Sequence, residues 1–284
     1  MLRVKHPLVM SSIVSCCVIA ITATSHAQVP ARTASSIVNR STAADSHPMD
    51  PALKLLQQSL THMQQNVNDY TALFVKRIRI AGELSEPQFA NMKVINRKTR
   101  DGQLTSPFSV YLKFLKPDVV AGREVIWVEN ANNGNLVAHE TGIGSLLNVN
   151  LDPRGMIAMR GERYPITEIG IENLAAQIIQ LGSKERAYGE CEVNFFRGAK
   201  VGERKCLMCQ VTHPVKRDHF EFYQARVYLD EELKVPIRYE RWLWPTEPGG
   251  KPALDEEFTY LNLKVNVGLT AEDFSTKNPE YGFR

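Results

Sequence analysis

The chain has 284 residues, of which 43% are hydrophobic, 8% aromatic and 23% charged. This apolar content is typical of a globular protein with a buried core and excludes a largely disordered chain. The formal net charge is only +3, and Lys and Arg are spread among Asp and Glu, so we expect no nucleic-acid partner.

The first 27 residues have the pattern of a secretory signal peptide. A basic start at Arg3 and Lys5 precedes an apolar run over residues 8–23, and small residues follow up to Ala27. We expect cleavage after Ala27, export to the periplasm or cell envelope, and no transmembrane span in the mature chain. Two alternatives stay open. The run could be a membrane anchor, although it is short and Ser-rich for a span of about 20 residues, or Cys16 could be lipidated.

Ordered structure is expected to begin at Asp50. Residues 28–49 are small, polar and aperiodic, which predicts a disordered linker. Asp50 is a suitable N-cap, and Pro51 suits the first helical position. Apolar residues then recur every three or four positions, so an amphipathic helix is predicted over 51–67. We expect residues 50–284 to form a single domain.

From Tyr70 onward the apolar period changes to two, which is typical of β-strands. The alternation is clearest over 70–80 and 108–114. Further extended runs, separated by Gly, Pro and Asn, cover 89–97, 123–129, 135–139, 190–197, 204–212, 219–229, 236–244 and 256–265. A second helix is predicted over 166–181, with Gly182 ending it. Sequential strands with short turns indicate an antiparallel meander, and its length favours a curled sheet because a flat one exposes two edges.

The predicted fold class is therefore mainly β with two helices (α+β), a curled antiparallel half-barrel lidded by the helices. Its concave face can pack shut or leave a cavity for an acyl chain or an apolar peptide. Strand alternation places one set of candidate ligand-binding side chains on that face: Ala72, Phe74, Phe108, Val110, Leu112, Phe114 and Trp127.

The predicted mature chain contains three cysteines, Cys191, Cys206 and Cys209. Export favours a disulfide. A hairpin turn near Lys200 would place Cys209 opposite Cys191, which makes this the preferred pair, with Cys206 as the alternative partner. A zinc site formed by the three cysteines and His213 stays open, but Cys206 and Cys209 should face opposite sides of a strand.

The sequence contains no catalytic motif. A nucleophile elbow, a zinc-protease helix and a phosphate-binding glycine loop are all absent. We therefore expect no catalytic residue, no cofactor and no metal, and a role that is not enzymatic.

Several segments resemble known families. The strand–turn–strand string VYLDEELKVPIRYE, residues 227–240, is similar to a signature of outer-membrane lipoprotein carriers and of sigma-factor regulator domains with the same fold. Over about residues 52–283 the chain resembles the secreted domain-of-unknown-function family 1571, through the segments GREV (122–125), RYPITEIG (163–170), EFTY (257–260) and DF…NPEYGF (273–283).

The resemblance implies a half-open, lipoprotein-carrier-like barrel lidded by helices. Carriers bind acyl chains in broad apolar pockets, with an Arg that helps to hold the closed state, and Arg77 and Arg79 lie at about that position on the first strand. The family itself has no established activity. Our hypothesis is an exported cell-envelope protein that binds a lipid, a lipoprotein acyl chain or another apolar ligand without catalysis. The alternatives are an interaction or sensor domain that docks an envelope protein partner, and an enzyme of unknown chemistry.

Overall fold

A computed structural model of the chain describes residues 36–37, 47–141 and 147–283. The signal peptide predicted for residues 1–27 and most of the linker predicted for residues 28–49 lie outside the described residues. Two parts of that linker are described. Ser36–Ile37 forms strand β1, which pairs with a later strand, and residues 47–49 lead into the first helix with Met49 buried.

Helix α1 (Asp50–Asn66) confirms the first helix, but it begins differently from the prediction. Met49 is the N-cap and Asp50 is the first helical residue, so Asp50 does not cap the helix with its side chain. Its carboxylate instead accepts a hydrogen bond from the backbone N–H of His47 (3.2 Å) and pairs with Arg186 at the end of the second helix. The two helices are therefore joined at this point by an ion pair.

The second predicted helix is confirmed in place but not in extent. A single 3-10 turn, Ile166–Glu168, is followed by Gly170 at φ +104° and then by α2 (Ile171–Glu185). Gly182 does not end the helix as predicted. A side chain at Gly182 would place its Cβ 3.0 Å from Leu53 Cδ2 of α1, so this glycine allows the two helices to approach closely.

Within the described residues, one antiparallel sheet contains thirteen strands, and a separate two-stranded hairpin follows β4. The strands of the first half are β2 (Asp69–Ile80), β3 (Glu83–Leu84), β4 (Gln88–Ile95), β5 (Lys98–Arg100), β6 (Gln103–Ser106), β7 (Ser109–Lys116), β8 (Glu124–Val128), β9 (Leu136–His139) and β10 (Asn148–Leu151). Those of the second half are β11 (Glu192–Val201), β12 (Arg204–Thr212), β13 (Gln224–Asp230), β14 (Pro236–Leu243) and β15 (Ala253–Val265).

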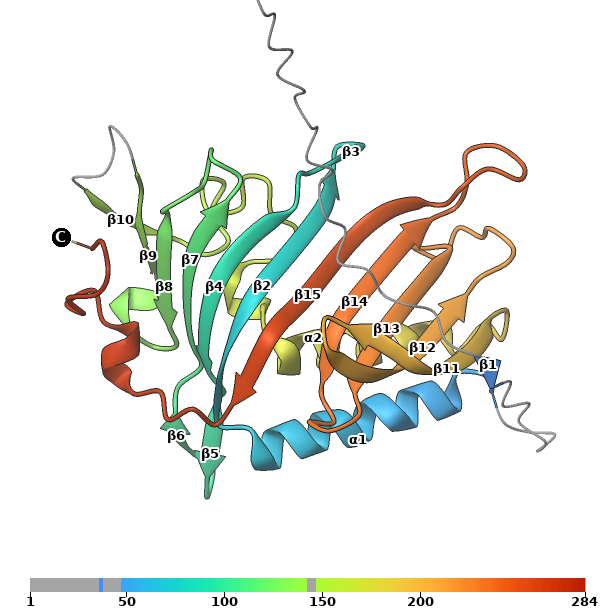
Figure 1. Cartoon of the computed structure of the whole chain (residues 1–284), viewed down its shortest axis with the longest axis horizontal. Coiled ribbons are helices and arrows are strands. Elements are labelled where there is room, and N and C mark those ends of the chain that lie inside the picture. The colour runs from blue at the N-terminus through green and yellow to red at the C-terminus, as the bar shows by residue number, and fades with distance from the viewer. Residues whose placement is uncertain (1–35, 38–46, 142–146, 284) are drawn as a thin grey trace, which may run out of the picture.

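The sheet joins two meanders side by side. Its order is β1-β11-β12-β13-β14-β15-β2-β4-β7-β8-β9-β10, and the thirteenth strand, β3, pairs with the end of β2 outside this order. The two halves meet where β15 pairs with β2. Figure 1 shows the curled sheet, with α1 along its lower edge and α2 behind the central strands. The predicted fold class is confirmed.

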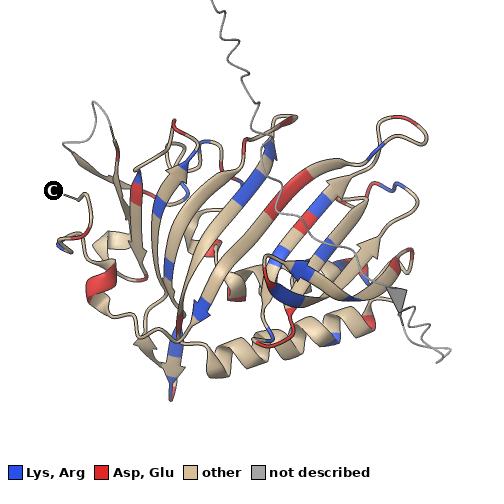
Figure 2. Ribbon diagram, viewed as in Figure 1, with Lys and Arg blue, Asp and Glu red and all other residues tan. Residues whose placement is uncertain are grey.

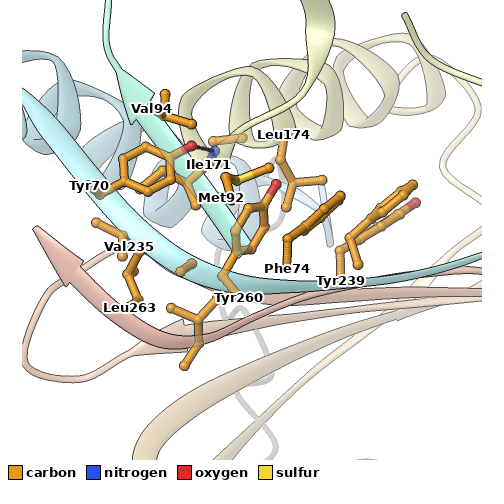
Figure 3. Packing of buried hydrophobic residues seen from close by; sticks show 14 of the residues in the cluster. Tyr70, Phe74, Met92, Val94, Ile171, Leu174, Val235, Tyr239, Tyr260 and Leu263 are labelled. Atoms are coloured by element: carbon orange, nitrogen blue, oxygen red, sulfur yellow. Dashed lines mark hydrogen bonds between the residues drawn. The ribbon is translucent and has the colours of Figure 1, made fainter. Parts of the chain in front are cut away.

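The main core fills the space between the concave face and the two helices. Figure 3 shows Tyr70, Phe74 and Tyr260 from β2 and β15 packed near Ile171 and Leu174 of α2. The Tyr70 hydroxyl is buried and accepts a hydrogen bond from the backbone N–H of Ile171 (3.1 Å). This bond satisfies one of the free N–H groups at the start of α2 and fixes the helix on the sheet.

Short strands and turn positions account for the differences from the prediction. Strands β3, β5, β6 and β10 have two to four residues each. Such strands are too short to be recognised from the alternation of apolar and polar residues. The β11–β12 turn lies at Gly202 and Glu203, not near Lys200, because β11 continues through a bulge to Val201. None of the helices in the described stretches is long and apolar enough to cross a membrane.

The C-terminal segment covers part of the opposite, outer face of the sheet. After β15 it passes through a 3-10 turn, Ala271–Phe274, and lies against β7 and β8, as Figure 1 shows at the left. Phe274 and Phe283 form a second small core there with Tyr111 and Ile126. Both faces of this half of the sheet are thus covered.

Candidate functional site

A cavity of about 470 Å³ lies on the concave face beneath the loop that joins β10 to α2. Its wall is contributed by β2, β7, β8, β9, β15, the last residue of β10 and residues 153–169 of that loop. Most of the lining is apolar, including Phe74, Leu112, Phe114, Leu136, Ile166 and Phe258. The curvature of the sheet and the bridging loop leave space that the helices do not fill.

Three of the seven predicted side chains, Phe74, Leu112 and Phe114, line this cavity. Ala72 and Val110 are buried in the adjoining core, where the helices pack against the sheet. Phe108 and Trp127 pack against each other with ring centroids 5.8 Å apart, and the Trp127 indole N–H donates to the carbonyl of Gly134 (3.1 Å). The alternation places these residues, but it does not separate cavity from core.

Five charged side chains line the cavity. Four of them form two ion pairs, and the fifth is a cation. Lys76 of β2 pairs with Glu162 of the loop, and its ammonium lies 5.6 Å from the centre of the Phe114 ring. Arg123 approaches Glu140 to 2.8 Å. Arg160 also lines the cavity and forms no ion pair with any described residue. The cavity is therefore amphipathic, with an apolar wall and a charged part.

Residues 162–164, which we call the latch, fasten the covering loop to the sheet. Arg163 donates to both carboxylate oxygens of Asp255 (2.9 Å each) and to Glu256, and the Tyr164 hydroxyl donates to Glu256 (3.2 Å). Arg241 of β14 contacts the same two carboxylates, at 2.7 Å from Asp255 and 3.3 Å from Glu256. Two arginines thus share two acids, and Figure 2 shows acidic residues of β15 between basic residues of β2 and β14.

A β-bulge explains how two consecutive acids reach the same arginines. Glu256 pairs with Arg241 and Leu254 pairs with Trp242, so Asp255 is an extra residue in β15. Burial opposes the ionisation of Asp255, but hydrogen bonds from Arg163 and the charge of Arg241 hold its pKa below the ordinary value. Burial raises the pKa of Glu256 in spite of the same arginines.

A second hollow of about 240 Å³ lies between α2 and β14. Tyr164 and Phe258 line both this hollow and the larger cavity. Their rings are 5.8 Å apart and meet edge to face at 68°. The latch tyrosine therefore stands between the two spaces.

The resemblance to carriers suggested that Arg77 or Arg79 lies at the cavity, but neither residue lines it. They alternate with Lys76 and Ile78, which line the cavity, so their side chains point to the other face. Arg79 donates instead to the backbone carbonyls of Leu254 (3.0 Å) and Gly82 (2.6 Å). Arg163, to which the sequence assigned no role, holds the covering loop, and Arg241 contacts the same two acids from β14.

The predicted disulfide is absent, since Cys191, Cys206 and Cys209 are all free. The β11–β12 register pairs Cys209 with Phe195 and Cys206 with Ala199, and Cys191 lies just before the first residue of β11. Burial raises the pKa of Cys191 to about 11, so its thiol is a poor nucleophile at neutral pH. Among the described residues, no group of three or more His, Cys, Asp or Glu side chains is arranged to hold a metal ion.

A buried acid and a buried histidine face each other at the end of α2. Glu185 Oε2 lies 3.6 Å from His213 Nε2, and the other ring nitrogen, Nδ1, is 3.0 Å from the carbonyl of Phe222. Burial, together with the negative charge of Glu221, raises the pKa of Glu185 to about 8. Burial also lowers the pKa of His213. Both groups are therefore held largely uncharged at neutral pH.

Sequence reasoning did not identify the charged residues around the cavity. Lys76, Arg123 and Arg160 are far apart in the sequence, and only strand pairing and the covering loop bring them to the same cavity. For the latch a usable pattern existed, because Arg163 and Tyr164 open the segment RYPITEIG that carries the family resemblance. A basic residue and an aromatic residue just before a helix that covers a sheet could have been assigned to loop anchoring.

Comparison with known proteins identifies the family. Residues 67–283 match the family described as "Protein of unknown function (DUF1571)". The chain belongs to this family. The predicted membership is thus confirmed, and no curated protein matches the chain.

Several solved structures are similar at low sequence identity. A putative outer-membrane lipoprotein-sorting protein domain from Vibrio parahaemolyticus is 12% identical, with 78% of this chain and 95% of that chain covered and a TM-score of 0.36. A chain of the MucA/MucB complex of Pseudomonas aeruginosa is 17% identical, with 79% of this chain and 60% of that chain covered and a TM-score of 0.43. A LolA superfamily protein from Nitrosomonas europaea is 8% identical, with 78% of this chain and 97% of that chain covered and a TM-score of 0.28. These likenesses are too distant to transfer an activity.

Proposed function

We propose that this protein is an exported, non-catalytic binding protein of the cell envelope, and that its cavity holds an apolar ligand such as a lipid or a lipoprotein acyl chain. The observation that carries the proposal is the cavity itself. At about 470 Å³ it lies within the range of about 300–1,000 Å³ that is common for small-molecule sites. An apolar wall of this kind favours a ligand that buries hydrocarbon against it.

The arrangement of the covering loop supports the same function. The cavity has the sheet on one side and the loop on the other, and the loop is held by ion pairs of the latch. Met156 in this loop is 89% exposed, and Ile157, which lines the cavity, is 69% exposed. Apolar residues in solvent at the edge of an apolar cavity suit a ligand that enters and leaves there.

A cavity-filling substitution tests the proposal. Ala138 of β9 lines the cavity and is buried, so Ala138→Phe should project its ring into the empty space. We expect the wild-type protein to bind N-phenyl-1-naphthylamine, a neutral apolar fluorescent probe, and Ala138→Phe to abolish binding while unfolding free energy changes by less than about 1 kcal/mol. Leu115→Phe is the matched control, because Leu115 lies on the outer face of β7 and is partly exposed.

A filled interior would give a different result. The added ring would then overpack the core and cost about 1–3 kcal/mol in urea unfolding. If the wild-type protein binds no probe and Ala138→Phe is destabilised to this extent, the binding function is wrong.

A further inference from the structure

Three charged groups of the cavity, Lys76, Arg123 and Glu140, share one edge of the sheet. The other two, Arg160 and Glu162, belong to the covering loop, where Glu162 pairs with Lys76. Strand pairing brings the start of β4, the end of β7, the start of β8 and the end of β9 to the same level. Lys76 lies opposite Gln88 at the start of β4, Arg123 immediately precedes β8, and Glu140 immediately follows β9. The opposite part of the wall, around Leu112, Leu136 and Ile166, is apolar. The cavity thus has a polar end and an apolar end.

The charges at the polar end do not balance. Three cations, Lys76, Arg123 and Arg160, line the cavity together with two carboxylates, Glu140 and Glu162. The carboxylates are engaged by Arg123 and Lys76, so the polar end has one excess positive charge. That charge belongs to Arg160, whose guanidinium has no ion-pair partner in the described ranges. An arginine presents a planar set of donors that fits a carboxylate or a phosphate.

We propose that the cavity takes an amphiphile with a single alkyl chain and an anionic oxygen head group, a carboxylate or a phosphate. The head group binds Arg160 at the polar end, and the chain lies along Phe74, Leu112 and Phe114. The volume of the cavity is in the lower part of the range for small-molecule sites, which favours one chain over several. This inference rests on the proposed function, because it specifies the ligand of the same cavity.

Displacement of the neutral probe by matched ligands tests the head-group preference. Decanoate, decyl phosphate and 1-decanol each contain ten carbons in one unbranched chain and differ in the head group. At low ionic strength, where exposed charges are least screened, we expect decanoate or decyl phosphate to displace N-phenyl-1-naphthylamine from the wild-type protein at about tenfold lower concentration than 1-decanol. The better of the two anions identifies the head group.

Two arginine variants locate the effect. Arg160→Gln should remove the advantage of the anionic ligands and leave displacement by 1-decanol unchanged. Arg154→Gln is the control, because Arg154 is in the same loop, is well exposed, pairs with Glu168 and does not line the cavity. It should behave as the wild type does. Circular dichroism checks that both variants fold.

The outcomes separate this inference from the function on which it rests. If the probe binds but the alcohol and the anions displace it equally, the head-group inference is wrong and the binding function stands. Equal losses in Arg160→Gln and Arg154→Gln would show only a general surface charge effect and would also overturn the inference. If the probe does not bind at all, the proposed function itself fails.

Discussion

At the scale of single residues, the pair Glu185 and His213 makes stability depend on pH in a defined window. The pKa of Glu185 is about 8 in the folded protein and 4.5 for the free side chain, so the folded state binds this proton more tightly. Its contribution is therefore present at low pH and is lost as pH rises from 4.5 towards 8. The pKa of His213 is lowered by burial, so its contribution has the opposite sign and grows as pH rises to 6.5. Above pH 6.5, of the two groups in this pair only Glu185 still lowers the unfolding free energy as pH rises.

Glu185→Gln should remove this loss, because the amide is neutral at every pH. Between pH 6.5 and 8 the wild-type unfolding free energy should fall by at most about 1.4 kcal/mol per pH unit relative to the variant. Urea unfolding at several pH values measures both proteins. Glu172, whose pKa burial raises to about 7, contributes equally to each. Parallel curves for the two proteins would contradict the assignment.

At the scale of elements, the latch determines how firmly the covering loop is held. In Arg163→Met the aliphatic stem stays and the guanidinium is lost, so Asp255 and Glu256 keep only Arg241 as a contact among the arginines described here. The Arg163 side chain is 24% exposed. We therefore expect a loss of about 1–3 kcal/mol in unfolding free energy, less than for a fully buried pair. Hydrogen exchange of the backbone amides in residues 152–165 should also accelerate.

Arg154→Met serves as the control for this prediction. The Arg154–Glu168 pair lies in the same loop, but the Arg154 side chain is 69% exposed, so its loss should cost less than about 1 kcal/mol. If the unfolding free energies of Arg163→Met and Arg154→Met both fall by less than about 1 kcal/mol, the latch does not hold the loop.

The elements also show which features of the sequence could be interpreted. Alternation in β2 and β7 and the helical spacing in α1 reflect burial against a single face, so these elements were predicted nearly to their ends. Gly182 was misinterpreted because glycine serves both helix ends and close helix contacts. The disulfide was wrongly predicted because the β11–β12 turn lies at Gly202 and Glu203 and not near Lys200, so Cys191 lies beyond the strand position that pairs with Cys209; the bulge between Phe196 and Ala199 shifts the register by only one residue.

The candidate site was less accessible to prediction than the fold. Phe74, Leu112 and Phe114, three of the seven predicted side chains, line the cavity because strand alternation determines which face a side chain occupies. The polar end of the cavity depends on contacts between a loop and four strands that are far apart in the sequence, and no local period encodes such contacts. The sequence therefore predicts the wall of the cavity but not its charges.

At the scale of the whole molecule, the sheet depends on cover from both sides. Phe274 of the C-terminal segment is buried against Tyr111 and Ile126 on the outer face. Phe274→Ala should lower the unfolding free energy by about 3–5 kcal/mol in urea unfolding, as is usual for a buried phenylalanine. The control Val267→Ala removes a partly exposed side chain just after β15 and should cost within about 0.5 kcal/mol. A loss below about 1 kcal/mol for Phe274→Ala would show that the segment is only loosely attached.

The pairing of β15 with β2 has a consequence for synthesis. The ribosome delivers Asp69–Ile80 early, whereas Ala253–Val265, its neighbour on one side, comes near the end of the chain. During that interval β2 and the strands after it can form a meander, but one long edge has unsatisfied N–H and C=O groups. Open edges of this kind recruit strands from other chains. The nascent protein is therefore most prone to aggregate before its last strand arrives, and a chaperone that shields β2 would protect it most.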